Sequence, residues 1–442
     1  MVIDELMLYR NMEHERILRD MVYLMEARDG GADASDKEFF SMRERLFSCV
    51  NGLVELAVSH GFEGNLWHAY LTFLLVNDEN AYSTSCEIVG EVKGSINSIA
   101  LHDFAVFKTL FDYDFAPLEK DLGTNCLSIL LDGYKNVEGK GKIFNKRIRD
   151  RICGLARALG ECGDAGGFKD CMTQFYKEFG VGSLGLHKAF RVEHPEGGKV
   201  TIAPITNIAH VHLDDLVGYE IAKKKLIDNT EAFVSGRRAN NCLLYGDAGT
   251  GKSSSIKAVL NQYYDRGLRM IEVYKHQFQD LNEVIAQIKS RNYKFIIYMD
   301  DLSFEEFEIE YKYLKAVIEG GLEKKPNNVL IYATSNRRHL IRETFRDKAD
   351  RDEELHTNDT VQEKLSLVAR FGVTIYYGSP DKKEFGQIVT TLAKNHGITM
   401  PEEELLLEAN KWEIAHGGLS GRTAQQFVDY LLGQPESRFI AG

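Results

Sequence analysis

One stretch constrains the possible folds of this chain more than any other: residues 242–253, Cys-Leu-Leu-Tyr-Gly-Asp-Ala-Gly-Thr-Gly-Lys-Ser. Its first four residues are apolar, as expected of a short strand buried on both faces of a parallel sheet. The next eight match the P-loop pattern G-x-x-x-x-G-K-[ST], in which successive backbone N–H groups point at phosphate oxygens. The stretch therefore predicts a strand, a loop and a helix in an α/β domain that binds a nucleoside triphosphate.

The residues of the loop have individual expected contacts. Its glycines let the backbone curl around the phosphates, and the following helix adds the positive end of its dipole. Lys252 can reach the β- and γ-phosphates of ATP, and the Ser253 hydroxyl can ligate Mg²⁺. The expected nucleotide contacts in this loop are Gly246, Asp247, Ala248, Gly249, Thr250, Gly251, Lys252, Ser253 and Ser254.

Length and composition exclude several classes of protein. A chain of 442 residues is long enough for two or three domains, and a hydrophobic fraction of 44% is ample for their cores. No apolar run approaches the roughly 20 residues of a membrane span, and the first residues do not resemble a signal peptide. Seven scattered cysteines without a C-x-x-C pair indicate reduced thiols and a cytoplasmic location. The formal charge of −12 argues against broad non-specific DNA binding.

Apolar spacing divides the chain into four parts. Residues 1–180 carry apolar side chains at helical intervals and show no catalytic pattern, which predicts an all-α N-terminal domain. Residues 181–212 read as a connector with a possible hairpin. Residues 213–378 alternate between strands and helices, as in an α/β nucleotide-binding core. Residues 379–442 contain three amphipathic helices, which we expect to form a lid.

Residues 268–274 form the second expected strand, and two acidic residues follow the third, about fifty residues beyond the loop. Phe295–Met299 is apolar and ends in Asp300 and Asp301. This is the Walker B arrangement, in which Asp300 would hold Mg²⁺ through water opposite Ser253. Asp301 would polarise the attacking water; alternatively it caps the next turn. Since aspartate is short for this task, hydrolysis could be slow or assisted by the nearby carboxylates of Glu305 or Glu306.

Two further segments are candidates for contact with the nucleotide. The strand 329–333 is followed by Thr-Ser-Asn, and the Asn336 amide could touch the γ-phosphate or orient the attacking water. A turn at Val217 and Gly218 could bring backbone atoms against the adenine.

In combination, the segments over about 213–433 resemble an AAA+ ATPase module. The features that carry this resemblance are the P-loop, Asp300-Asp301, Asn336, Arg370 before Phe-Gly, and Ser-Gly-Arg422. More narrowly, residues 299–304, 332–340 and 365–372 resemble a family of uncharacterised bacterial AAA+-like ATP-binding proteins. The resemblance implies a five-stranded parallel sheet flanked by helices, with a three-helix lid.

The resemblance also implies roles for single residues. Asn336 corresponds to the sensor-1 residue, and Arg422 to the sensor-2 residue that contacts phosphate in cis. Arg370 corresponds to the arginine finger that a neighbouring subunit inserts beside the γ-phosphate, which implies a homo-oligomer. Each arginine could instead form a salt bridge at a helix end. Arg337 and Arg338, directly after the sensor-1 position, are further candidates.

The sequence therefore favours an Mg-dependent ATPase that remodels an unknown protein or nucleic-acid client, with residues 1–200 recognising that client. The alternative is a slowly hydrolysing switch or loader, linked to DNA replication or repair. A small-molecule kinase is disfavoured, because no phosphate-clamping arginines or acceptor pocket can be recognised between the strands.

Overall fold

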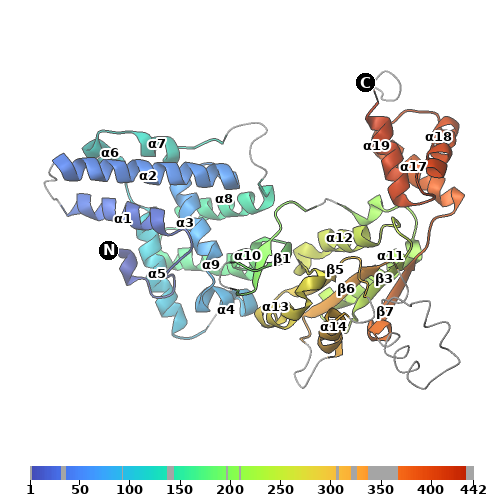
Figure 1. Ribbon diagram of the computed structural model, residues 1–442. Coiled ribbons are helices and arrows are strands. Elements are labelled where there is room, and N and C mark those ends of the chain that lie inside the picture. The colour runs from blue at the N-terminus through green and yellow to red at the C-terminus, as the bar shows by residue number, and fades with distance from the viewer. Residues whose placement is uncertain are drawn as a thin grey trace. The chain divides into compact units, whose positions relative to one another are not determined.

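The computed structural model describes residues 2–30, 36–91, 93–136, 144–195, 198–208, 211–304, 308–319, 326–336 and 367–434. The chain divides into two compact units, Met1–His187 and Lys188–Gly442 (Figure 1). Each unit has its own buried apolar core.

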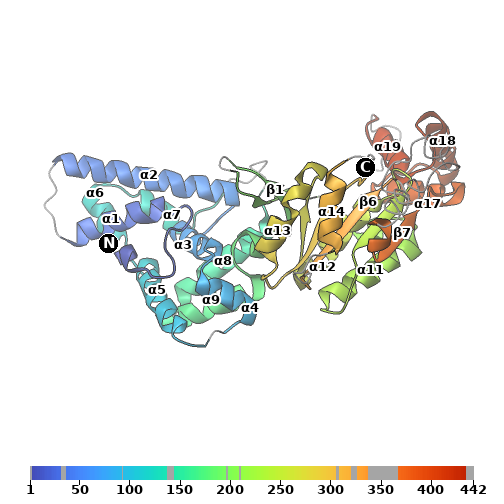
Figure 2. The ribbon, with the colours of Figure 1, turned by 60° about the horizontal axis from the view of Figure 1, so that its bottom comes forward.

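The first unit is all-helical, which confirms the prediction for the N-terminal part of the chain. Its core is organised around α3, where every side chain from Leu66 to Val76 is buried except for the half-buried His68. A helix that is apolar on all sides can be stable in water only when other helices surround it, and α2, α5, α7, α8 and α10 pack against α3 (Figure 2). The elements are η1 (Val2–Glu5), α1 (Arg16–Asp29), α2 (Asp36–His60), α3 (Leu66–Asn77), α4 (Ala81–Val89), α5 (Ile96–Phe111), α6 (Ala116–Leu122), α7 (Cys126–Leu131), α8 (Lys146–Glu161), α9 (Ala165–Phe179) and α10 (Gly182–Leu186).

A buried carboxylate fastens the N-terminal segment of this unit to α5. Asp103 is fully buried, and its oxygens accept hydrogen bonds from the backbone N–H groups of Leu8 (2.7 Å), Met7 (3.0 Å) and Tyr9 (3.2 Å). Charged acceptors make the stronger class of hydrogen bond, and they are costly to bury unless they are satisfied in this way. The N-terminal loop is therefore part of the folded core.

The second unit is built on a seven-stranded sheet in the order β2-β1-β4-β5-β6-β3-β7. The five expected parallel strands are present in it, which confirms the α/β prediction. They are β3 (Cys242–Gly246), β4 (Leu268–Glu272), β5 (Lys294–Met299), β6 (Val329–Ser335) and β7 (Val373–Tyr377).

Two additional strands extend this sheet beyond the five that were expected. β1 (Ala189–Glu193) pairs antiparallel with β2 (Thr201–Pro204) and parallel with the edge of β4. The hairpin expected in the connector therefore exists, but it belongs to the sheet. The side chains of Phe190 and Val192 are buried there.

The predicted connector, residues 181–212, spans the division between the two units. Its first residues, Val181 and Leu186, are buried in the core of the helical unit, whereas its hairpin is part of the sheet. The division falls between His187 and Lys188, and not at residue 180. The apolar side chains of this segment therefore belong to the cores of both units.

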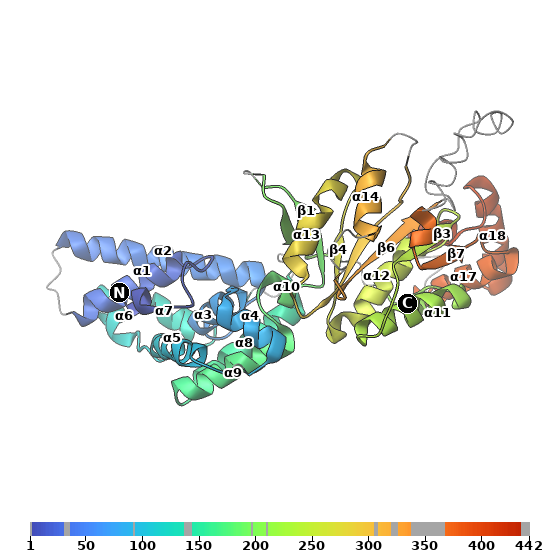
Figure 3. The ribbon, with the colours of Figure 1, turned by 90° about the horizontal axis from the view of Figure 1, so that it is seen from below.

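Helices cover both faces of the sheet. The buried side chains of α11 (Glu220–Val234) and α12 (Lys252–Tyr263) pack against one face. α13 (Leu281–Ile288) and α14 (Glu310–Glu319) lie on the opposite side of the strands (Figure 3). Strands buried on both faces explain the near-continuous apolar runs in the sequence.

The three predicted C-terminal helices are present and share a small core of their own. They are α17 (Lys382–Asn395), α18 (Glu402–Ala415) and α19 (Gly421–Leu432), joined through side chains that include Phe385, Val389, Phe427 and Val428. Asp381 caps α17 by accepting the N–H of Glu384 at 2.7 Å, and Ser420 caps α19 by accepting the N–H of Thr423 at 3.1 Å. None of the helices in the described parts of the chain combines the length and apolarity of a transmembrane segment.

Candidate functional site

The P-loop leaves β3 in a conformation that only glycine allows. Gly246 has a φ of +138°, and a Cβ atom there would lie 2.0 Å from the carbonyl oxygen of Tyr377. The same carbonyl accepts the N–H of Asp247 at 3.0 Å. The end of β7 thus holds the start of the loop, and the loop turns from there into α12.

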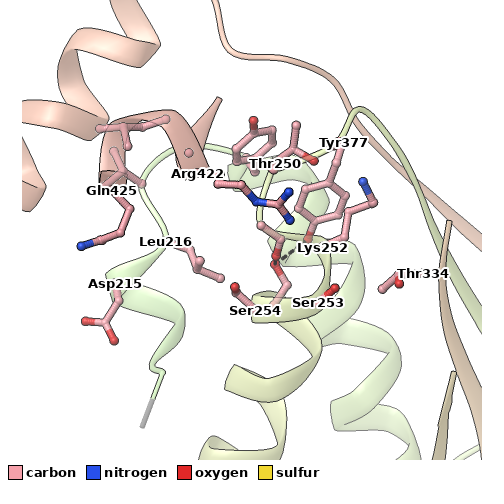
Figure 4. Close-up of a pocket in the computed structure, with 18 of the residues that line it drawn as sticks. Asp215, Leu216, Thr250, Lys252, Ser253, Ser254, Thr334, Tyr377, Arg422 and Gln425 are labelled. Atoms are coloured by element: carbon pink, nitrogen blue, oxygen red, sulfur yellow. Dashed lines mark hydrogen bonds between the residues drawn. The ribbon is translucent and has the colours of Figure 1, made fainter. Parts of the chain in front are cut away.

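An open cleft of about 660 Å³ lies over the loop, between the sheet and the lid (Figure 4). Most of the residues predicted to contact ATP or Mg²⁺ line it. These are Val217, Ala248, Gly249, Thr250, Gly251, Lys252, Ser253, Ser254, Asp300, Asp301, Asn336 and Arg422. Gly246 and Asp247 form the base of the loop, and Gly218 lies beside Val217 without lining the cleft. A volume of this size accommodates a nucleotide.

The ammonium group of Lys252 has three oxygen partners inside the cleft. Its Nζ donates to the backbone oxygens of Asp247 at 2.6 Å and Gly246 at 3.0 Å, and to Oδ1 of Asn336 at 3.0 Å. Only 6% of the residue is exposed. Burial lowers the pKa of Lys252, although nearby carboxylates act in the opposite direction.

Two hydroxyl groups converge on the carboxylate of Asp300. Oδ1 of Asp300 accepts from Ser253 Oγ at 2.7 Å and from Thr334 Oγ1 at 2.5 Å. Burial by itself would raise the pKa of Asp300, but the hydrogen bonds from Thr334 and Ser253 outweigh it and lower that pKa below its usual value. Asp300 is therefore ionised at neutral pH.

Asp301 and Asn336 form the next part of this network. Asp301 has a φ of +50°, and its N–H donates to Thr334 Oγ1 at 2.9 Å. Its Oδ1 accepts from Nδ2 of Asn336 at 2.8 Å. The positive φ is in the left-handed region, which aspartate tolerates better than most residues. A continuous chain of hydrogen bonds connects Ser253, Asp300, Thr334, Asp301, Asn336 and Lys252.

The lid contributes a contact from the opposite side of the loop. The N–H of Arg422 donates to the carbonyl oxygen of Gly249 at 3.1 Å. A Cβ atom at Gly249 would lie 3.0 Å from both Cβ of Arg422 and Oγ of Ser420. Figure 4 shows the Arg422 side chain extending from α19 towards Lys252. The first turn of α19 therefore packs directly against the P-loop.

Sequence reasoning missed several other residues that line the cleft. Leu216, Ile388 and Leu392 supply apolar surface to it, from both the core and the lid. The ring of Tyr219 lies over that of Tyr377 with centroids 5.2 Å apart. These residues follow no motif, because they come from segments more than 150 residues apart.

Arg370 does not line the cleft of its own chain. It forms an ion pair with Glu319 at the end of α14, which is the salt bridge considered above as the alternative to a finger. The other candidates near these segments, Glu305, Glu306, Arg337 and Arg338, lie outside the described residues.

The oxygen donors of Ser253 and Asp300 fit a magnesium ion. Mg²⁺ prefers hard oxygen ligands, and it commonly takes only one or two from the protein, with water and phosphate supplying the rest. The two oxygens are 2.7 Å apart, and the carboxylate is ionised. Among the described residues, no group of three or more His, Cys, Asp or Glu side chains forms an all-protein metal site.

Residues 185–435 match the model of a protein family described as "Protein of unknown function (DUF815)". The chain belongs to this family. The matched residues begin near the end of α10 and extend beyond α19, so they include every described helix and strand of the second unit.

Similar proteins were found by sequence and by structure. Replication factor C subunit 3 of Schizosaccharomyces pombe is 30% identical over 108 residues, which are 24% of this chain; the match spans only 30% of that relative's length. The Thermotoga maritima RuvB Holliday junction branch migration motor is 13% identical, with a TM-score of 0.32 over 50% of this chain and 72% of that one. The FIGL-1 AAA domain in complex with ADP is 18% identical, with a TM-score of 0.34 over 51% and 74%.

This DUF815 chain is a member of the AAA+ ATPase superfamily. The sequence predicted that membership, and the sheet, P-loop and three-helix lid of the second unit agree with it. The P-loop and the cleft above it lie within the residues that the family model matches.

Proposed function

We propose that this chain is a magnesium-dependent ATPase that couples ATP binding and hydrolysis to the remodelling of a macromolecular partner. The observation that carries the proposal is the hydrogen-bonded chain that runs from Ser253 to Lys252 across the carboxyl ends of three parallel strands. This network contains the Lys252 ammonium, which could reach phosphate, and the Asp300 carboxylate, which could bind magnesium. It also contains the Asp301 carboxylate, which could act as a general base.

The phosphates of ATP would lie between the P-loop and the lid. The backbone N–H groups of the loop and the Lys252 ammonium would bind them from the side of the sheet. The guanidinium of Arg422 would bind them from the lid, since it extends into the same cleft. Ser253 and Asp300 would hold Mg²⁺, which neutralises charge on the β- and γ-phosphates.

Asp301 would accept the proton of the attacking water. Its carboxylate lies at the end of β5, directly after the magnesium ligand, and Asn336 donates a hydrogen bond to it. Since the same Asn336 amide accepts from Lys252, the lysine determines the orientation of the amide and thereby the position of the Asp301 carboxylate. Asn336 acts in this scheme as a positioning residue.

Arg370 would act in a neighbouring subunit. It is outside its own cleft, as required of a residue that completes a different active site. The proposal therefore includes a homo-oligomer in which Arg370 leaves Glu319 for the γ-phosphate of the adjacent chain.

The second candidate is a nucleotide-dependent switch or loader that turns over slowly. One observation favours it: Oδ1 of Asp301 already accepts a hydrogen bond from Nδ2 of Asn336 at 2.8 Å, so this oxygen must also accommodate the attacking water. The curated relative, which is by name a replication factor subunit, suggests replication as the setting.

Phosphate release by the full-length chain with Mg-ATP tests the first proposal. We expect steady turnover that requires magnesium and disappears in Lys252→Ala. Tight ATP binding with no turnover would favour the switch. Failure to bind any nucleoside triphosphate would overturn both.

The client can then be sought with a variant that binds ATP without hydrolysing it. We expect Asp301→Asn to retain a partner in the presence of ATP. Lys252→Ala, which should not bind ATP, is the matched control. A partner captured equally by both variants would not depend on nucleotide, which contradicts the coupling.

A further inference from the structure

Two thiols of the helical unit lie in contact. Sγ of Cys162 is 3.6 Å from Sγ of Cys171. Cys162 is the residue at which α8 ends, and Cys171 lies in the second turn of α9. All seven cysteines of the chain are free thiols in this structure.

We propose that Cys162 and Cys171 form a reversible oxidation site, at which a small-molecule disulfide converts the two thiols into an intramolecular disulfide. A disulfide bond is about 2.0 Å long, so the sulfurs must approach each other by roughly 1.6 Å. The inference is independent of the ATPase proposal, because it rests on the first unit alone.

The local backbone allows the sulfurs of Cys162 and Cys171 to approach each other. Cys162 has already left the helical conformation, with φ and ψ of −63° and 131°. It is followed by Gly163, and Gly166 and Gly167 form the first turn of α9. A Cβ atom at Gly163 would meet nothing within 4 Å, and one at Gly167 would make only ordinary van der Waals contacts, with Asp164 Oδ1 at 3.6 Å and with Cys162 at 3.9 Å. The segment between the two thiols can therefore adjust without a clash.

The two thiols are also accessible to a small reagent. Both residues are partly exposed, and Cys162 is flanked by the exposed Glu161 and Gly163. Cys49, Cys86 and Cys242 are in contrast fully buried or nearly so. A reagent in solution can reach the contacting pair at the end of α8 without unfolding the unit.

The reaction is a thiol–disulfide exchange in two steps. The thiolate of one cysteine attacks a sulfur of the small disulfide and expels one small thiolate, leaving a mixed disulfide on the protein. The thiolate of the other cysteine then attacks the protein sulfur, closes the Cys162–Cys171 bond and expels the second small thiolate. Two protein thiols are oxidised, one small disulfide is reduced, and the two protons are taken up by the released thiolates.

Formation of the mixed disulfide is the slow step. Closure of the Cys162–Cys171 bond is favoured because the two sulfurs are already close together. Burial and the neighbouring Cys171 raise the pKa of Cys162 to about 11, which keeps the thiolate fraction low at neutral pH. Once a mixed disulfide exists, the attacking sulfur is already in contact with it. The bond would tie the end of α8 to α9, two helices that pack against α3, α4 and α5 (Figures 2 and 3).

Mass spectrometry of the oxidised full-length chain tests the proposal. After incubation with oxidised glutathione, the protein is denatured, alkylated and digested with trypsin. We expect two of the seven thiols to escape alkylation. We also expect the peptides 158–169 and 170–177, which trypsin separates after Lys169, to be joined by a disulfide and released by dithiothreitol.

Serine variants provide the controls. Cys162→Ser and Cys171→Ser should each lack the linked peptides and stop at a glutathione adduct on the remaining cysteine of the pair, whereas Cys153→Ser, also on α8, should form the linked peptides as the parent does. In the parent chain, seven alkylated thiols, a glutathione adduct that persists on Cys162, or a disulfide between other cysteines would each overturn the proposal.

A second probe tests the proximity of the thiols without oxidation. Phenylarsine oxide bridges two neighbouring thiols, so we expect one adduct on the parent chain and on Cys153→Ser. Loss of that adduct in Cys162→Ser would identify the pair, and an adduct unaffected by this substitution would contradict the contact.

Discussion

The side-chain amide of Asn336 donates to Oδ1 of Asp301 across 2.8 Å, and its own Oδ1 accepts from Lys252 at 3.0 Å. The amide therefore connects the lysine proposed to bind phosphate with the carboxylate proposed to activate water. Its two ends are not interchangeable, since the cation requires the oxygen and the carboxylate requires the N–H.

Asn336→Asp replaces the donor with a second carboxylate beside Asp301. Like charges at this distance would displace the Asp301 side chain or protonate one of the pair. We expect phosphate release to fall about 100-fold, the usual loss when one oriented donor is removed from a catalytic site. ATP affinity should change less, because the aspartate can still accept from Lys252. Asn336→Ala is the control: it removes the donor without adding charge, and an equal or larger loss than in Asn336→Asp would contradict the repulsion.

Asp301→Asn should abolish turnover while ATP binding is retained. The variant removes the proposed proton acceptor, and loss of such a group costs about 100-fold or more in rate. Asparagine tolerates the φ of +50° at this position as well as aspartate does, so backbone strain cannot account for a loss. Phosphate release and the Kd of a fluorescent ATP analogue give the two measurements. If turnover persisted, the water would have to be activated by another group.

Gly249→Ala should separate the lid from the P-loop. The added methyl group would lie 3.0 Å from Arg422 and Ser420, at a φ of +75°. Gly251→Ala is the matched control, with a φ of +88° but only a loose contact, 3.6 Å from Leu216. Both variants carry a backbone cost of about 1–2 kcal/mol. Faster hydrogen exchange at the first-turn amides of α19 in Gly249→Ala alone would establish the lid contact, and equal rates in the two variants would refute it.

Asp103→Asn should destabilise the helical unit without affecting ATP binding. The variant keeps the shape of the side chain but removes the charge that accepts three backbone N–H groups. Because hydrogen bonds to a buried charge are worth about 1.5–3 kcal/mol, we expect a loss of about 2–3 kcal/mol in the free energy of unfolding. Urea unfolding followed by circular dichroism measures it. A nucleotide affinity that fell along with stability would show that the two units are energetically coupled.

Local motifs made most of the second unit predictable. The P-loop, the aspartates after β5 and the three lid helices are each recognisable within about fifteen residues, because strand burial and helix capping leave local patterns. The contacts that complete the site are not local. Thr334 reaches Asp300 because β5 and β6 pair with Met299 opposite Ala333, and no residue in either strand specifies that register.

The same limit explains why the strand pairing of the connector hairpin and the conformation of Gly246 could not be predicted. The apolar side chains of β1 predict a buried strand, but not that it pairs with the edge of β4. Gly246 is required because the carbonyl of Tyr377, 131 residues later in the chain, lies against it. Pairing between distant strands determines both features, and such pairing cannot be read from one sequence.

Mixing two inactive variants tests whether Arg370 acts in a neighbouring subunit. Lys252→Ala should not bind ATP, and Arg370→Ala should bind ATP but hydrolyse it at least about 100-fold more slowly, since an arginine finger contributes about 10³–10⁵ in rate. In a mixed oligomer, a cleft with an intact Lys252 can receive an intact Arg370 from the other variant, so phosphate release should partly recover. Glu319→Ala is the control, because it removes the ion-pair partner of Arg370 and leaves the arginine itself in place. Recovery without any oligomer, or full activity of Arg370→Ala alone, would be incompatible with a finger that acts in trans.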